Sequence, residues 1–368
     1  MNIVWFNWKD LDNPQAGGAE VVNEELAARL AAAGHTVTFI TAGYPGASAT
    51  AVRRGFSVVR VGSRFTVYLA AARYFRAHRA QLRPDLVIDE CNTMPFFAGR
   101  YTGVRTVLFF HMLCREIWFY EFPQPLSTLG YLLEPLYLRL LKPKSAVIAV
   151  SASTKLDLVR HGFTARSIRV IAEATQLTPV PELRAIAKYP DPTLLSLGAM
   201  RSMKRTLHQI AAFELAKAQL PRLKFIVAGD LSGPYGARVQ AAIAASPHHH
   251  DITVLGRVTP ARKAQLMQKS HLLLVTSVKE GWGLVVTEAA TQGTPAVVYD
   301  VDGLRDSVRH GRTGLVTAPS PQALATATAS LLQDPARYEQ LRTAAYTWAS
   351  TLTFDRAYAD FAAALKLS

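Results

Sequence analysis

The sequence predicts an α/β protein built from two Rossmann-like domains, and three observations lead to that prediction. Short β-branched apolar runs alternate with helical segments such as 19–33 and 206–219, an order typical of parallel sheets. The apolar runs are almost continuous, as strands buried on both faces require. The stretch 178–192 contains four prolines and divides the 368-residue chain into halves, each of a size suited to one domain.

The expected strands follow one another through both halves of the chain. They lie at 2–7, 36–41, 57–61, 86–89, 106–111 and 146–151, and then at 194–198, 224–229, 252–255, 272–276 and 296–299. We expect domains at 1–178 and 179–353, with a helix at 354–368 packing back onto the first. Ligands of such sheets bind beyond the carboxyl ends of the strands. Two domains facing each other would therefore hold a ligand in the cleft between them.

Charge and cysteine content limit the partners and the compartment. The net charge of +14 suits nucleic acid, an anionic membrane surface or a phosphorylated small substrate. Cys91 and Cys114 have no metal-ligand spacing and make no disulfide framework, which favours a reducing, cytoplasmic location. The N-terminus lacks the features of a signal peptide. No run of 18 apolar residues predicts a membrane span.

The segment 279–289 reads KEGWGLVVTEA and lies between an apolar run and a helical run. Its glycines let the backbone approach a ligand closely. The amides of Gly283, Leu284 and Val285 would be free at the helix start and could hold a diphosphate. Glu288, in an early turn of that helix, can accept hydrogen bonds from both hydroxyls of a ribose. Glu280 precedes the helix, where it can accept from sugar hydroxyls.

The spacing of these two glutamates resembles a known family signature. A Glu, seven residues and a second Glu, beginning with Glu280, Gly281, Trp282 and Gly283, resemble the motif of the family-four retaining glycosyltransferases, which have the GT-B fold. Segments at 293–295 (GTP), 303–306 (GLRD) and 311–315 (GRTGL) also match, in order. The resemblance implies that Glu280 contacts the donor sugar and Glu288 the ribose of a nucleotide-diphosphate sugar.

The same resemblance implies a donor substrate and no bound cofactor or metal. The DVD sequence at 300–302 matches the metal-binding pattern of other glycosyltransferases, but its context belongs to the metal-free family. We therefore interpret it as loop carboxylates. The HHHD sequence at 248–251 is interpreted as a surface loop.

A basic segment at 198–205, GAMRSMKR, follows the first strand of the second half. It resembles the family segment in which an Arg and a Lys bind the donor diphosphate. Lys204 fits the Lys position, whereas Ala199 occupies the usual Arg position. Either Arg201 or Arg205 supplies the missing charge, and the sequence leaves both open. Such a cation suits the chemistry, because negative charge builds on the leaving diphosphate.

Two features of the first half complete the predicted site. Gly17 and Gly18 lie in a QAGGAE loop after the first strand, which resembles a family loop near the donor phosphates. Asn7, at the end of the same strand, is a further candidate for lining the cleft. His111 ends a later strand, where the resemblance implies a histidine beside the donor sugar and the reacting centre. A lone histidine beside an apolar run is otherwise a structural residue.

The predicted function is retaining transfer of a sugar to an acceptor hydroxyl, in cell-surface polysaccharide or glycolipid synthesis. The resemblance implies front-face attack, and a covalent glycosyl–Glu280 intermediate is the second route. A nucleotide-sugar epimerase of the same architecture is the alternative function. Nucleic acid is not an expected partner, because the basic residues form no recognised binding module.

The acceptor is expected to be a glycan, a glycolipid or a small molecule bound by the first half. Segment 113–144 is rich in aromatic and leucine residues and carries Arg139, Lys142 and Lys144. Segment 64–83 mixes arginines with Tyr68, Leu69, Tyr74 and Phe75, among others. Such faces can lie on the anionic inner face of a membrane. The alternative is that the aromatics form core or a dimer contact and the arginines a solvated face.

Overall fold

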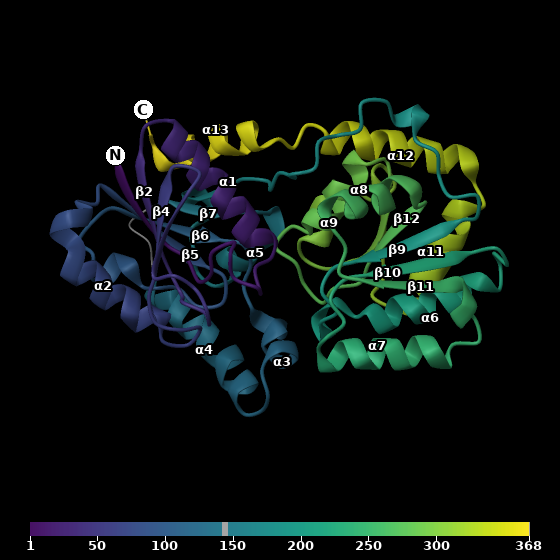
Figure 1. Ribbon diagram of the computed structural model, residues 1–368, viewed down its shortest axis with the longest axis horizontal. Coiled ribbons are helices and arrows are strands. Elements are labelled where there is room, and N and C mark those ends of the chain that lie inside the picture. The colour runs from purple at the N-terminus through teal and green to yellow at the C-terminus, as the bar shows by residue number, and fades with distance from the viewer. Residues whose placement is uncertain (142–145, 368) are drawn as a thin grey trace. The chain divides into compact units, whose positions relative to one another are not determined.

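The computed structural model describes residues 1–141 and 146–367, and the chain folds into two compact units. Unit 1 comprises Met1–Arg115, Thr128–Ala174 and the C-terminal segment from Phe354 onwards. Unit 2 comprises Glu116–Ser127 and Thr175–Thr353 (Figure 1). The short stretch Glu116–Ser127 therefore belongs to unit 2, although the sequence prediction places it within the first domain.

Unit 1 is built on a sheet whose described strands run in the order β3-β4-β2-β1-β5-β6-β7-β8. Neighbouring strands are parallel except for the antiparallel pair β3 and β4. The strands are β1 (Asn2–Phe6), β2 (Thr36–Thr41), β3 (Thr50–Arg53), β4 (Phe56–Arg60), β5 (Leu86–Cys91), β6 (Thr106–Phe110), β7 (Val147–Ala149) and β8 (Ile168–Val170).

The C-terminal helix is part of the core of unit 1. Phe361 of α13 (Phe354–Leu365) stacks on Trp5, with ring centroids 5.5 Å apart, and also contacts Phe109 at 5.5 Å. The helix packs beside α1, so the last described helix of the chain packs against the sheet that contains the first strand. The other helices are α1 (Gly18–Ala32), α2 (Val67–Leu82), α4 (Leu126–Leu140, whose first two residues are assigned to unit 2) and α5 (Ala152–Arg160).

Unit 2 is built on a parallel sheet in the order β11-β10-β9-β12-β13-β14. The strands are β9 (Thr193–Leu197), β10 (Lys224–Ala228), β11 (Ile252–Gly256), β12 (Leu272–Val275), β13 (Ala296–Tyr299) and β14 (Gly314–Thr317). The helices are α3 (Trp118–Glu121), α6 (Thr206–Lys217), α7 (Pro234–Ala245), α8 (Pro260–Lys269), α9 (Leu284–Thr291), α10 (Leu304–Ser307), α11 (Pro321–Leu332) and α12 (Pro335–Ala349).

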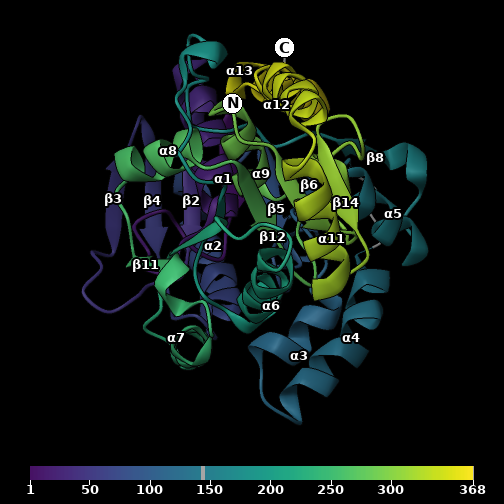
Figure 2. The same ribbon diagram turned by 90° about the vertical axis from the view of Figure 1, so that its right-hand side faces the viewer.

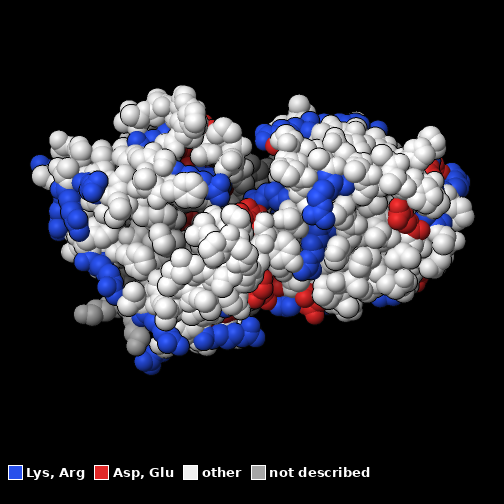
Figure 3. All heavy atoms as spheres, turned by 90° about the horizontal axis from the view of Figure 1, so that it is seen from below, with Lys and Arg blue, Asp and Glu red and all other residues white. Residues whose placement is uncertain are grey.

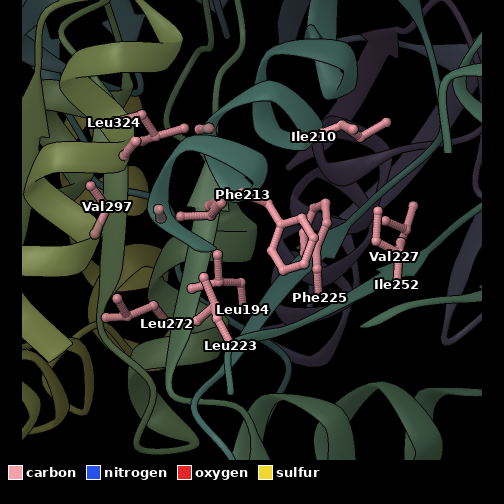
Figure 4. Close-up of a cluster of buried hydrophobic side chains, with 14 of the residues drawn as sticks. Leu194, Ile210, Phe213, Leu223, Phe225, Val227, Ile252, Leu272, Val297 and Leu324 are labelled. Carbon is pink, nitrogen blue, oxygen red and sulfur yellow. The ribbon is translucent and has the colours of Figure 1, made fainter. Parts of the chain in front are cut away.

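The central strands of unit 2 are buried on both faces. Leu194 and Val297 point into a core that α6 and α11 cover (Figures 2 and 4). In that core Phe213 of α6 stacks on Phe225 of β10, with ring centroids 5.6 Å apart. The next residue of β9, Leu195, points into the opposite core. This alternation explains why the strands read as continuous apolar runs.

The predicted fold class is confirmed, and each predicted strand overlaps a strand of the structure. The prediction missed β3, β8 and β14, which are three or four residues long. It was wrong about β3 in a second way, because this strand makes the antiparallel pair. Short strands with partly exposed residues lack the longer apolar run on which the prediction depends. In the described part of the chain, no helix combines the length and apolarity that crossing a bilayer requires.

Candidate functional site

Two loops of unit 2 come together at the carboxyl ends of β9 and β12. These strands are neighbours in the sheet, so the segments that follow them start side by side. The hydroxyl of Thr276 donates to the carbonyl oxygens of Lys204 and Arg205 at 2.8 and 3.1 Å. The amide of Val278 donates to the carbonyl of Met203 at 2.8 Å. We call segments 198–205 and 276–283 together the donor loops.

The predicted cation and the predicted sugar-binding carboxylate meet in the donor loops. Lys204 Nζ lies 2.5 Å from Glu280 Oε1, and the hydroxyl of Ser277 donates to the same oxygen at 2.6 Å. The Lys204 and Glu280 side chains are 32% and 13% exposed, so a solute can reach the pair. Two residues 76 positions apart in sequence are therefore held together in the structure.

The start of α9 has no side-chain cap. Its N-cap residue, Gly283, has a left-handed backbone (φ 90°) and makes no side-chain hydrogen bond to the helix. The first amides of a helix have no partner within it, so Leu284 and Val285 present N–H groups and the positive end of the helix dipole. Such a terminus favours an anion such as a phosphate.

Glycines also let the neighbouring loops pack tightly against each other. A Cβ at Gly283 would lie 2.9 Å from Cδ2 of Leu304, and one at Gly303 only 2.3 Å from the carbonyl oxygen of Glu280. The Glu280 amide donates to the carbonyl of Asp302 at 3.0 Å. The loop that carries Glu280 therefore rests directly on the segment before α10.

Trp282 and Glu288 differ in what their side chains contact. Trp282 is buried, with its ring centroid 6.2 Å from that of Trp348, so it anchors the loop that begins at Glu280 and Gly281. Glu288, on α9, accepts from Lys263 Nζ of α8 at 2.6 Å and is 14% exposed. Its carboxylate is thus held in place by a cation.

Both arginines that the sequence left open are directed at α3. Arg201 donates to Glu121 Oε1 through Nη2 at 2.7 Å and through Nε at 3.1 Å. Arg205 donates through Nη2 to the hydroxyl of Tyr120 at 3.3 Å, and its guanidinium lies 5.9 Å from the centre of that ring. The hydroxyl of Ser202 donates to the Tyr120 carbonyl at 2.9 Å. The segment Glu116–Ser127 is therefore fastened to the donor loops.

The sequence did not single out Lys263 or the charge network around Asp302. Asp302 accepts from Lys279 Nζ at 3.0 Å and from Arg305, and Arg305 also donates to Asp300 at 2.8 Å. Burial on its own raises the pKa of Asp302, but Lys279 and Arg305 outweigh burial and hold that pKa below its ordinary value. Lys263 is one of several basic residues on α8, and no spacing distinguishes it. The GLRD match was the one signal that pointed at Arg305.

In unit 1 the predicted glycines lie at the start of α1. Gly17 is the N-cap residue, and its amide donates to Glu20 Oε2 at 2.6 Å. Gly17 has φ −136°, so its backbone is an extended one that any residue can adopt. Glu20 itself is buried, and Lys9 Nζ lies 3.5 Å from its other oxygen. Glu20 therefore satisfies the helix start that Gly17 and Gly18 form.

His111 lies in a buried polar cluster at the carboxyl end of β6. Its Nδ1 is 2.8 Å from Glu173 Oε1, and its Nε2 is 3.1 Å from Asn23 Oδ1 and 3.6 Å from Glu90 Oε1. Burial alone lowers the pKa of His111, but the hydrogen bond to Glu173 and the charges of Glu173, Glu90 and Glu20 outweigh it and raise that pKa. Burial raises the pKa of Glu90 to about 7, against the opposing charge of His111.

Asn7 is a further polar residue of unit 1, at the carboxyl end of β1. It is 1% exposed, and neither polar atom of its side chain has a hydrogen-bond partner among the described residues. Leaving a buried amide unsatisfied costs about 1–3 kcal/mol. A structural role alone does not account for such a residue at the ligand-binding edge of a sheet.

Two Rossmann-like units with a cation, paired carboxylates and an uncapped helix start at the carboxyl ends of the strands define the GT-B class. Family models match both halves of the chain: Glycosyltransferase Family 4 at residues 16–176 and Glycosyl transferases group 1 at residues 182–348. The chain belongs to the family-four glycosyltransferases, as the sequence motifs predicted. Both models describe transferases, so the epimerase alternative gains no support.

Individual relatives place the chain within this family. It is 32% identical over 212 residues to the D-inositol 3-phosphate glycosyltransferase of Rhodococcus opacus, which is 53% of this chain and 47% of the relative. It is 26% identical over 211 residues to the glycogen synthase of Mycobacterium tuberculosis, which is 56% of this chain and 50% of the relative. The chain thus spans about half the length of the curated relatives it matches.

Solved structures show the same fold over the whole chain. Sucrose-phosphate synthase from Thermosynechococcus elongatus superposes with a TM-score of 0.81 at 20% identity, covering 99% of this chain and 98% of that one. HepE of Anabaena, in complex with UDP-glucose, superposes with a TM-score of 0.73 at 18% identity, covering 99% of both chains. At these identities the likeness is one of fold.

Proposed function

We propose that this chain transfers a sugar from a nucleotide-diphosphate donor to an acceptor hydroxyl, with retention of the anomeric configuration and without a metal ion. The observation that carries the proposal is the Lys204–Glu280 contact of 2.5 Å beside the uncapped start of α9. A relative named D-inositol 3-phosphate glycosyltransferase supports sugar transfer, and a structural neighbour solved with UDP-glucose supports the donor class.

Lys204 and the start of α9 act on the leaving group. Cleavage of the sugar–phosphate bond places negative charge on the nucleoside diphosphate. A positive charge already fixed in place stabilises that charge without reorganisation, and loss of one such contact typically costs about 10²–10³ in rate. The amides of Leu284 and Val285 add the helix dipole to the same task.

Glu280 binds the donor sugar through hydroxyl groups. Its Oε1 already accepts from Lys204 and Ser277, which orients the carboxylate and weakens Oε1 as a nucleophile. This arrangement favours the front-face route, in which the leaving phosphate takes the acceptor proton, over a covalent glycosyl–Glu280 intermediate. Glu288, held by Lys263 at 2.6 Å, accepts from the ribose hydroxyls.

A transfer assay with retained stereochemistry tests this function. Nucleotide-diphosphate sugars are supplied one at a time with polyol, glycoside and lipid-linked acceptors, in one series with EDTA and in a parallel series with added divalent metal. Release of the nucleoside diphosphate is measured, and the anomeric coupling of the product is read by proton NMR. We expect one donor to be consumed and its anomeric configuration kept. Failure to consume any donor, an inverted product or a requirement for added metal would contradict the proposal.

We further propose that the acceptor is reached at an anionic membrane surface, at the inner face of the membrane, through α4. Six leucines of α4 are 44–61% exposed: Leu126, Leu129, Leu132, Leu133, Leu136 and Leu140. Figure 3 looks onto the side of the chain that carries α4 and shows a largely uncharged area with Lys and Arg side chains along its edge. Arg139 is exposed, and Arg100 Nη2 donates to the carbonyl of Leu140 at 3.2 Å. An apolar stripe with a basic border suits anionic lipid.

The second segment considered for this role has a different structure. In α2, Phe75 is buried, and Tyr68 and Tyr74 pack against the same core cluster. Arg73, Arg76 and Arg79 are exposed on the other side of the helix. The aromatics of α2 therefore belong to the core, as the alternative interpretation held. Lys142 and Lys144, also considered for this surface, lie outside the described residues.

Vesicle flotation separates a membrane surface from a dimer contact. Leu132→Gln with Leu136→Gln is compared with Leu69→Gln, because Leu69 is also a highly exposed leucine but lies on α2. We expect the double variant alone to lose flotation with vesicles that contain anionic lipid. If the wild-type chain does not float, or if the double variant instead dissociates a dimer in sedimentation, the α4 surface is not a membrane surface.

A further inference from the structure

Both ring nitrogens of His111 face oxygen atoms. Nδ1 lies 2.8 Å from a carboxylate oxygen of Glu173, and Nε2 lies 3.1 Å from the amide oxygen of Asn23. A neutral imidazole has one N–H and one bare nitrogen, so it could donate to only one of these acceptors. Donation to both requires the doubly protonated imidazolium.

The surroundings of His111 are anionic from three elements. Glu173 follows β8, Glu90 lies in β5, and Glu20 lies in the first turn of α1. All three side chains are at most 6% exposed. Glu20 also has Lys9 at 3.5 Å, so Glu173 and Glu90 are the carboxyls that have His111 as their nearest described cation. Coulomb attraction from buried carboxylates favours the charged ring.

The ring is also fixed in space. The hydroxyl of Thr154 donates to the carbonyl oxygen of His111 at 3.1 Å, and the Phe109 ring lies 4.6 Å from the imidazole, centre to centre. With the backbone, the ring face and both nitrogens in contact, His111 has little freedom to rotate. The contact with Glu173, at 2.8 Å, is shorter than those of the ring nitrogens with Asn23 and Glu90.

We infer that Glu173 is a positioning residue that keeps His111 as an imidazolium, so that His111 serves the reaction as a fixed positive charge. This inference rests on the proposed transfer for its consequence and on unit 1 alone for its geometry. An imidazolium has no lone pair with which to take a proton. His111 therefore does not act as the general base, which leaves the acceptor proton to the departing phosphate.

Nitrogen NMR of the full chain tests the protonation state without any donor. The ring nitrogens of His111 are assigned by the signals that disappear in His111→Gln. At pH 7 we expect both nitrogens of His111 to carry a proton. In Glu173→Gln we expect about tenfold weaker proton affinity, which is one pKa unit. A His111 ring with one bare nitrogen at pH 7, or an unchanged titration in Glu173→Gln, would overturn the inference.

Glu24→Gln is the matched control. Glu24 is a buried carboxylate on α1, next to Asn23, but it pairs with Arg53 at 2.8 Å. Its loss removes the same charge and an ion pair, and we expect the His111 titration to stay as in the wild type. Glu173→Asp keeps the charge, and we expect His111 to remain an imidazolium in this variant. It therefore provides a test even if Glu173→Gln does not fold. An equal change in Glu24→Gln and Glu173→Gln would contradict a specific role for Glu173.

Transfer kinetics provide a readout that a purely structural role would not move. In Glu173→Gln the alkaline limb of the kcat profile should shift to lower pH by the same amount as the His111 titration. A loss of kcat that is equal at every pH contradicts the inference. If the wild type transfers no sugar, the proposed function fails, while the NMR result still decides the state of His111.

Discussion

The donor loops of unit 2 and the polar cluster of unit 1 hold their charges in opposite ways. In the donor loops and the adjoining helix α9 each site carboxylate meets a cation, as in Lys204–Glu280 and Lys263–Glu288, and the paired side chains are 13–32% exposed. In the cluster, three carboxylates at most 6% exposed surround the single ring of His111. Partly exposed ion pairs contribute little to stability and exchange readily for a ligand. Buried charges are costly unless they are paired and hydrogen-bonded, and removing one partner leaves an uncompensated charge.

The largest expected effect is on catalysis and comes from the donor loops. Lys204→Ala should lower kcat by about 10²–10³, because it removes the positive charge from the leaving diphosphate. Lys224→Ala is the control, because Lys224 makes a similar pair with Asp251 at 2.5 Å outside the donor loops. Steady-state rates at saturating donor measure both variants. Equal rates in the two variants would remove Lys204 from the mechanism.

The second prediction concerns stability against pH and comes from the buried cluster. Burial raises the pKa of Glu90 from its ordinary 4.5 to about 7, and the pKa of His111 is raised as well. Between pH 4.5 and about 7 the Glu90 carboxyl keeps its proton in the folded chain and releases it in the unfolded chain. The free energy of unfolding therefore falls as the pH rises through this window. Glu90→Gln should recover about 3 kcal/mol at pH 8 and little at pH 4.5.

Hydrogen exchange of peptides from β5 and β6 between pH 5 and 8 measures this effect within unit 1. Exchange rates are corrected for intrinsic pH dependence, and peptides of β9 serve as the internal control in unit 2. A Glu90→Gln chain that shows the wild-type pH dependence in β5 would mean that Glu90 holds no excess proton in the folded state.

The smallest expected effect compares two left-handed glycines of unit 2. Gly303 has φ 79° and its Cβ would lie 2.3 Å from a carbonyl oxygen, whereas Gly311 has φ 71° and no atom within 4 Å. Alanine strains the backbone at both positions. Only Gly303→Ala also pushes against the loop of Glu280, at a further cost of about 1–3 kcal/mol. Thermal unfolding should show that difference, and equal losses would mean that the loops are not tightly packed.

Much of the donor loops was predictable, because their functional residues lie close together within short sequence segments. Glycines, glutamates and a lysine at fixed spacing sit where strands turn into helices. Their placement followed once the strands were assigned. The sequence did not predict a role for Lys263, because this residue lies on α8, whose basic residues have no distinctive spacing. The sequence also did not predict that Glu116–Ser127 packs on unit 2, because Glu121 and Tyr120 read as ordinary helix residues.

The sequence did not predict most of the polar cluster around His111 in unit 1. His111 and Asn7 were predicted, whereas Asn23 comes from α1, Glu90 from β5 and Glu173 from the segment after β8. Each reads as an ordinary residue of its segment, because a pairing across a sheet depends on strand order, which one sequence does not specify. The order β1-β5-β6-β7-β8 brings them to one edge of the sheet.

Calorimetric titration of the donor loops tests the central claim most directly. A ribonucleoside diphosphate, its 2′,3′-dideoxy form and inorganic pyrophosphate are titrated into the wild type, Lys204→Ala and Glu288→Gln. Lys204 should contact the diphosphate and Glu288 the ribose. We therefore predict that Lys204→Ala weakens all three ligands and that Glu288→Gln weakens only the ribonucleoside diphosphate. Wild-type affinity in both variants, or no binding of any diphosphate by the wild type, would contradict the account.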